Sequence, residues 1–157
     1  MRFRARIHHP KPDEIRKIHP AGLLLATDPL ELAQFCRLIQ SIRNNDRRTI
    51  ESLMRKGIPG IADYVHPTEG ETAVGLAASK NDDAMVRFLT DLGANPSVVD
   101  LQGKSAAMKA AELGFVEAME AVATANCDMK LIDEDGKGIG IFSLYIFIQG
   151  ARWSSGD

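Results

Sequence analysis

The stretch that decides the fold is written twice, as GETAVGLAA at residues 70–78 and as GKSAAMKAA at residues 103–111. Corresponding positions lie 33 residues apart (70 to 103), and Gly136 begins a third copy at the same interval. A fixed period of this length is typical of a repeat array, in which each unit buries its apolar face only against its neighbours. The rest of the chain is therefore expected to flank or cap this array.

Composition favours a single soluble globular domain. The chain has 157 residues, of which 45% are hydrophobic and 25% are charged, so it can bury a core. A formal charge of -2, from 19 Lys+Arg and 21 Asp+Glu, argues against strong overall attraction to nucleic acid or membranes. Two cysteines and no apolar signal segment favour a reduced, cytoplasmic compartment. The longest apolar run, residues 141–148, is too short for a bilayer span, which needs roughly 20 residues.

Start signals and apolar spacing predict a helical hairpin ahead of the repeats. Asp28 can accept from the first free backbone donors, Pro29 fits the first helical position, and Glu31 can reach back to the cap. Apolar residues then recur at intervals of three and four until an Asn-Asn-Asp turn interrupts them. Asp46 can cap a second helix, and Gly57 stands where a left-handed residue usually closes one.

Each repeat is expected to hold two helices. They follow a loop of irregular backbone at residues 57–69, with Thr72 and Ser105 opening the first helix of each copy and Gly93 closing a second one. Asn126 takes the place of glycine at the next closing position, a conformation that Asn tolerates at a small cost. The four helices are predicted at residues 72–80, 84–92, 105–113 and 115–125.

The two copies resemble the ankyrin repeat. The likeness rests on the period, on the hydroxyl that opens each copy, on the Ala-Ala pair, and on Gly93-Ala94-Asn95 after a second helix. Where the family has Thr-Pro-Leu-His, this chain has TAVG at residues 72–75 and SAAM at residues 105–108. The resemblance implies an all-α ankyrin-repeat solenoid. The hydroxyls can still bond within the turn, but the absent histidine removes a bond that usually ties one unit's loop to its neighbour.

The resemblance also divides the chain into a repeat domain and two flanks. The repeats would be helix-turn-helix units of 33 residues behind the N-terminal helical hairpin, and the pattern fails after Gly138. The expected segments are a basic, mobile arm at residues 1–27, an ankyrin-repeat domain at 28–140 with units at about 30–66, 67–99 and 100–132 and a partial unit from 133, and an irregular apolar tail at 141–157.

Ankyrin arrays imply non-catalytic protein-protein binding through extended fingers and the exposed edge of each first helix. Transferred residue by residue, these positions form an ordered row of mixed charge that includes two leucines. Taken singly, each position also fits a solvated surface residue. The predicted partner-binding residues are Thr68, Glu69, Glu71, Ser79 and Lys80 in one unit, Leu101, Gln102, Lys104, Glu112 and Leu113 in the next, and Glu134, Asp135 and Lys137 in the last.

A narrower resemblance links the chain to proteins that combine ankyrin repeats with EF-hands. It rests on SIRNND at residues 41–46, LGA at 92–94, AAELG at 110–114 and DGKG at 135–138. This resemblance implies a cytoskeletal interaction protein of the axoneme in a cilium or flagellum. The chain would then be a short form that stops before any EF-hand.

No motif in the chain predicts catalysis, a metal site or a cofactor. DEDGKG at residues 133–138 has the look of a calcium loop, but in neither glycine register does a carboxylate stand at the twelfth position. The histidines have no cysteine or carboxylate at ligand spacing. Cys127, which matches Ala94, and Cys36, which follows Phe35, are expected in the core, where thiols are usually inert.

The first twenty residues carry a local excess of four positive charges, six Lys and Arg against Asp13 and Glu14. Such an arm could contact the acidic surface of microtubules or the phosphates of nucleic acid, through bonds that salt would weaken. A solvated arm without a partner is the other interpretation. The sequence therefore predicts a protein-binding module, with an electrostatic adaptor as the alternative.

Overall fold

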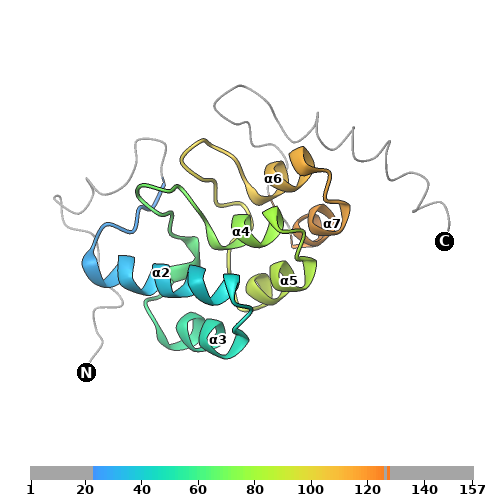
Figure 1. Ribbon diagram of the computed structural model, residues 1–157. Helices are drawn as coiled ribbons and strands as arrows, with labels where there is room; N and C mark the ends of the chain where they lie inside the picture. The colour runs from blue at the N-terminus through green and yellow to red at the C-terminus, as the bar shows by residue number, and fades with distance from the viewer. Residues whose placement is uncertain (1–22, 126, 128–157) are drawn as a thin grey trace.

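The computed structural model describes residues 23–125 and 127. There the backbone folds into three successive pairs of α-helices, with one 3-10 helix between the first and second pairs (Figure 1). Within the described residues no helix is both long and apolar enough to cross a membrane. The helices are α2 (Pro29–Arg43), α3 (Arg47–Lys56), the 3-10 helix η2 (Ile61–Asp63), α4 (Ala73–Ser79), α5 (Asp83–Asp91), α6 (Ala106–Leu113) and α7 (Val116–Thr124).

The helices begin at the capping residues that the sequence predicts. The Asp28 carboxylate accepts from the backbone of Leu30 at 3.1 Å, and Pro29 occupies the first turn of α2. The hydroxyl of Thr72 accepts from the Gly75 amide at 3.1 Å at the start of α4. At the start of α6 the hydroxyl of Ser105 accepts from the Met108 amide at 3.3 Å. Each cap satisfies a backbone donor that has no partner inside its helix, so the predicted starts are confirmed.

The helix ends differ from the prediction at Gly57. Gly93 has the expected positive φ, at 105°, and Gly114 at the end of α6 also has a positive φ, at 73°. Gly57 instead has φ -81°, so the prediction of a left-handed closing residue is wrong there. A Cβ at this position would meet the carbonyl oxygen of Leu53 and lie 2.7 Å from Oε1 of Gln34. Glycine is therefore required at residue 57 by close approach rather than by left-handed backbone.

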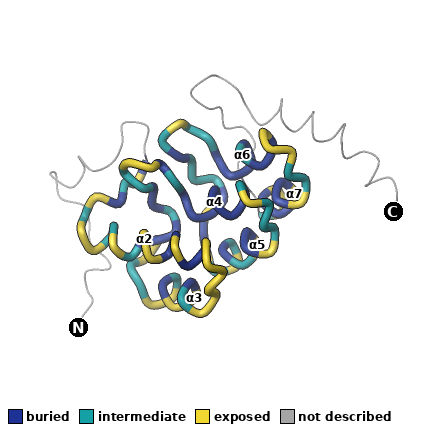
Figure 2. Tube along the Cα trace, in the orientation of Figure 1, coloured by how far each residue is buried: buried dark blue, intermediate teal, exposed yellow. Residues whose placement is uncertain are grey.

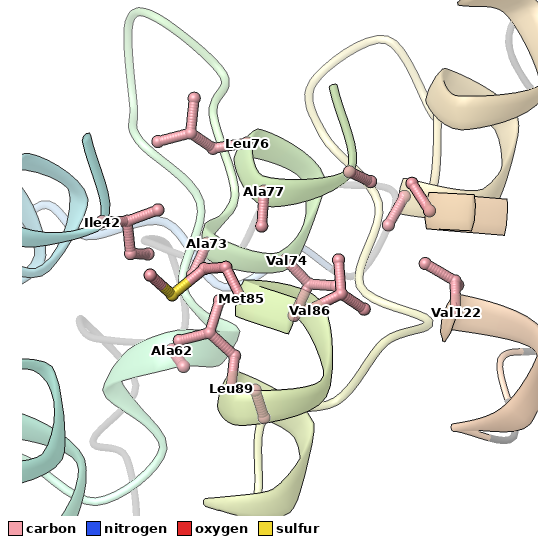
Figure 3. Close-up of a cluster of buried hydrophobic side chains, with 14 of the residues drawn as sticks. Ile42, Ala62, Ala73, Val74, Leu76, Ala77, Met85, Val86, Leu89 and Val122 are labelled. Carbon is pink, nitrogen blue, oxygen red and sulfur yellow. The ribbon is translucent and has the colours of Figure 1, made fainter. Parts of the chain in front are cut away.

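The paired helices stack in two layers around one hydrophobic core. α4 packs against α6, and α5 packs against α7, so corresponding helices of neighbouring pairs lie side by side (Figure 1). The core is continuous and runs from Ile42 in α2 through Val74, Met85 and Val86 to Val122 in α7 (Figure 3). The Ala-Ala pairs of α4 and α6 are buried, and α4 and α6 pack against each other.

A short segment before α2 pairs with the connection between α3 and α4. Leu25 and Val65 form a parallel β-bridge, in which Val65 donates to Leu24 at 2.9 Å and accepts from Ala26 at 3.1 Å. The side chains of Leu23 and Ala26 are buried. Residues 23–26 are thus packed onto the helical body, and the connection predicted as irregular backbone contains both this bridge and η2.

The two cysteines lie in different environments. Cys127 is buried, as predicted, with its sulfur 3.5 Å from the carbonyl oxygen of Pro96. Cys36 is exposed, so its prediction as a core residue is wrong. Phe35 points into the core, and the next residue of a helix is rotated by about 100° from it, because a turn holds about 3.6 residues.

Four predicted features lie outside the described residues. They are residues 1–22 of the basic arm, the closing residue Asn126, the partial unit from residue 133, and the tail at residues 141–157.

Candidate protein-binding site

Two loops project to the same side of the helices and carry exposed tips (Figures 1 and 2). We call residues 57–72 the first finger and residues 93–105 the second finger. A cleft of about 230 Å³ lies between them, and we call it the finger cleft. It is lined by Thr68, Glu69, Gly70, Glu71, Asp100, Leu101, Gln102 and Lys109. Five of these residues belong to the predicted partner-binding set.

The tip of the first finger is organised by His66. Its Nδ1 accepts from the backbone amides of Thr68 at 3.3 Å and Glu69 at 3.1 Å. The His66 backbone donates to the Glu71 carbonyl at 3.0 Å, and its own carbonyl accepts from Gly70 at 3.0 Å. Gly70 takes a φ of 74°, which glycine adopts without strain. Because Nδ1 is an acceptor, the neutral ring carries its proton on Nε2.

The tip of the second finger is organised by Asp100, which is only 6% exposed. Its Oδ1 accepts from the backbone amides of Gln102 at 2.8 Å and Lys104 at 2.9 Å. Its Oδ2 lies 3.1 Å from the ammonium nitrogen of Lys109, which comes from α6. One buried carboxylate therefore fixes the backbone of the tip and joins it to the helix behind it.

Lys109 also occupies the interface between neighbouring helix pairs. A Cβ placed on Gly75 in α4 would lie 3.1 Å from the Lys109 nitrogen. Gly75 stands where the ankyrin signature has histidine, so the ammonium of Lys109 fills space that a side chain at residue 75 would take. α6 therefore packs against α4 at Gly75 without a side chain at that position.

The first finger is also tied at its base. Asp63 Oδ1 accepts from the backbone of Asn95 at 2.9 Å, and burial raises the pKa of the Asp63 carboxyl. The Tyr64 hydroxyl donates to Glu31 Oε2 at 2.8 Å. Burial, followed by this bond to a carboxylate, raises the pKa of Tyr64 well above its usual value. The Glu31 carboxylate therefore anchors the finger to α2.

Several predicted binding residues take part in bonds that hold the fingers in place. Glu71 accepts twice from Arg43, at 2.9 and 2.8 Å, which joins the first finger to α2. Lys104 in the second finger pairs with Glu112 of α6 at 2.9 Å. These groups remain partly accessible, so the same side chains that support the fingers also form part of their surface.

The other predicted residues border the cleft or lie beyond the described chain. Ser79 donates to the Leu76 carbonyl at 2.8 Å, and Lys80 is exposed at the end of α4. Leu113 is 53% exposed at the end of α6. Glu134, Asp135 and Lys137 lie outside the described residues.

Sequence reasoning missed four residues that shape this surface. Arg43, His66, Asp100 and Lys109 do not match the positions transferred from the ankyrin pattern, yet each holds a finger through its side chain. Lys109 carried a signal, because it is a charged residue at the position where the other repeat has Leu76. The roles of Arg43, His66 and Asp100 depend on how their side chains are placed, and no sequence pattern predicts them.

Comparison with known proteins agrees with this architecture. A family model described as ankyrin repeats in 3 copies matches residues 38–133. The solved ankyrin repeat domain of Bcl-3, described as a unique member of the IkappaB protein family, is similar with a TM-score of 0.60 and 22% sequence identity. The similarity covers 65% of this chain and 44% of that one, so the chain spans less than half of that domain's length.

At this identity the likeness to the solved domain shows the fold alone. The family match is independent of it and covers more than half of the chain. Together with the stacked helix pairs, these matches confirm the predicted all-α ankyrin fold. The chain belongs to the ankyrin-repeat family.

Proposed function

We propose that the finger cleft, with the adjoining ends of α4 and α6, is the surface through which this chain binds a protein partner. Ankyrin repeats are protein-protein interaction modules and typically have no catalytic role. The observation that supports this surface is the cleft of about 230 Å³ between two fingers whose tips are held by buried or multiply bonded side chains.

A surface whose loops are already fixed before the partner arrives favours binding. His66 and Asp100 each fix two backbone amides, so the fingers lose little conformational freedom when a partner arrives. Leu113 adds exposed apolar area beside the charged groups, the mixture usual at protein interfaces.

The test is capture of partners by the immobilised full chain from an extract of ciliated cells. The double variant Leu101→Ala/Leu113→Asp should lose the captured proteins, whereas Ala84→Asp should retain them. Ala84 is exposed on α5, in the other helical layer, so it makes a matched control. Circular dichroism of both variants checks that they fold. Equal capture by all three proteins would contradict the assignment of this surface.

The narrower resemblance supports a more specific role. We place the partner among cytoskeletal or axonemal proteins of a cilium or flagellum, and we regard the chain as related to proteins that also carry EF-hands. Enrichment of axonemal proteins in the same capture experiment is the expected result. Their absence from the captured set would contradict this role.

The charge of the first twenty residues supports a second candidate. Six Lys and Arg against two acidic residues make residues 1–27 a candidate electrostatic adaptor for microtubules or nucleic acid. Deleting residues 1–17 should then abolish a salt-sensitive interaction and leave capture through the fingers unchanged. Salt-independent binding to microtubules would exclude this candidate.

A further inference from the structure

The charges that line the finger cleft are unbalanced. Glu69, Glu71 and Asp100 contribute three carboxylates, and Lys109 contributes one ammonium group. Lys109 is engaged with Asp100, and Arg43 binds Glu71 from the side of α2. Glu69 is exposed, and its carboxylate forms no ion pair with any described residue. The cleft therefore has a net negative lining with one carboxylate open to a ligand.

One wall of the cleft is apolar. Leu101 packs across Gly70, so closely that a Cβ on Gly70 would lie 3.3 Å from the Cβ of Leu101. The volume of about 230 Å³ corresponds to roughly eight water molecules at about 30 Å³ each. This space suits one long side chain. A side chain with an aliphatic stem and a charged end would place the stem on Leu101 and the end near the carboxylates.

Other ligand chemistries fit less well. An acidic side chain would face three carboxylates, and the ammonium of Lys109 is already paired with Asp100. A purely apolar side chain would remove Glu69, Thr68 and Gln102 from water without supplying hydrogen-bond partners, which is unfavourable. A cationic side chain supplies both the charge and the donors.

From these observations we infer that the finger cleft binds an arginine or lysine side chain of the partner protein. The stem lies against Leu101, and the cationic end is bound by the carboxylate of Glu69. This inference rests on the proposed function, because it names the chemistry of the partner at the same surface.

The test uses N-acetyl-arginine amide as the probe, titrated into the full chain while backbone amide resonances are recorded. N-acetyl-citrulline amide is the control probe, because it has nearly the same shape without the charge. The arginine probe should shift the amides of residues 68–71 and 100–102, and the citrulline probe should not. N-acetyl-lysine amide should shift the same amides. Added salt should weaken the binding of both cationic probes.

Two variants make the result specific. Glu69→Gln keeps the shape of the side chain and should weaken binding of the arginine probe about threefold, the size expected for loss of an exposed ion pair. Glu120→Gln, at an exposed position on α7, should bind as the parent chain does. The inference would be overturned if the citrulline probe gave shifts equal to those of the arginine probe, or if the arginine probe gave no shifts or shifted other residues. Unchanged affinity of Glu69→Gln for the arginine probe would also overturn it.

The outcomes also separate this inference from the proposed function. If the probe result fails while the Leu101→Ala/Leu113→Asp variant still loses its captured partner, only the cationic ligand is wrong. If the probe binds as expected while that double variant captures partners normally, the cleft recognises a basic side chain but the proposed binding surface is wrong.

Discussion

Asn81 combines a turn conformation with a capping role for another helix. Its φ of 55° lies in the left-handed region, where it separates α4 from α5. Its Oδ1 accepts from the Ala118 amide at 3.2 Å, and its Nδ2 donates to Glu117 at 2.9 Å. Phe115, at the start of α7, makes no capping bond with its side chain. The cap of α7 is therefore supplied by the preceding helix pair.

Replacing Asn81 should separate these two roles. Asn81→Gly keeps the left-handed backbone and removes both bonds, so it should lower the free energy of unfolding by about 1 kcal/mol, as for loss of an N-cap. Asn81→Ala should lower it further, because alanine also disfavours positive φ. Urea denaturation followed by circular dichroism measures both effects. A glycine variant as stable as the parent chain would show that the cap contributes nothing.

Asp63 leads to a prediction about pH. Burial raises the pKa of this carboxyl in the folded protein, so the folded state binds the proton more readily than the unfolded state. Stability from this group is therefore complete below its unfolded pKa of 3.8 and is lost as pH rises through the higher folded pKa. Asp63→Asn avoids ionisation and keeps an oxygen that can accept from Asn95.

The stability of Asp63→Asn relative to the parent chain should thus increase between about pH 3.5 and pH 7. Parallel thermal denaturation across this range measures the difference. Asp83→Asn, at a site that pairs with Arg87 on the surface of α5, is the control and should not show that increase. A constant difference for Asp63→Asn across the range would contradict the raised pKa.

At the scale of elements, the repeat period and the capping residues were enough to locate the helices. The four predicted helices of the two repeats agree with α4 to α7 within one residue at each end. The prediction for Cys36 was wrong because the spacing of apolar residues does not define where the buried face of the long helix α2 ends. The finger positions followed from the resemblance to the ankyrin repeat, but the joining of Asp100 to Lys109 could not, since it depends on how the two side chains meet.

That pair makes the second finger sensitive to a change in α6. Lys109→Met should leave the buried Asp100 carboxylate without its cation and lower the free energy of unfolding by about 2 kcal/mol, the range for hydrogen bonds to charged groups. It should also speed amide exchange at Gln102 and Lys104, whose amides Asp100 accepts. Lys80→Met, at an exposed lysine, is the matched control. Equal behaviour of the two variants would show that the pair does not hold the finger.

At the scale of the whole molecule, neighbouring helix pairs are joined by a small number of polar contacts beside the shared core. The first and second pairs are linked by Arg43 with Glu71 and by the Arg47 guanidinium, 4.8 Å from the centre of the Phe88 ring. The second and third pairs are linked by Asn81 to α7. In a repeat array, stability is close to a sum of unit and nearest-neighbour terms, so each contact should act on its own interface.

Amide hydrogen exchange can test this locality with two variants. Arg47→Gln removes a cation–π contact worth about 0.5–1 kcal/mol and should speed exchange in α2 and α3, the pair at one end of the described array. Asn81→Gly should speed exchange in α6 and α7 and leave α2 and α3 nearly unchanged. Because the two variants act on different interfaces, amide exchange should become faster at opposite ends of the described array. The same acceleration in all six helices for both variants would instead mean that the described chain opens as one cooperative unit.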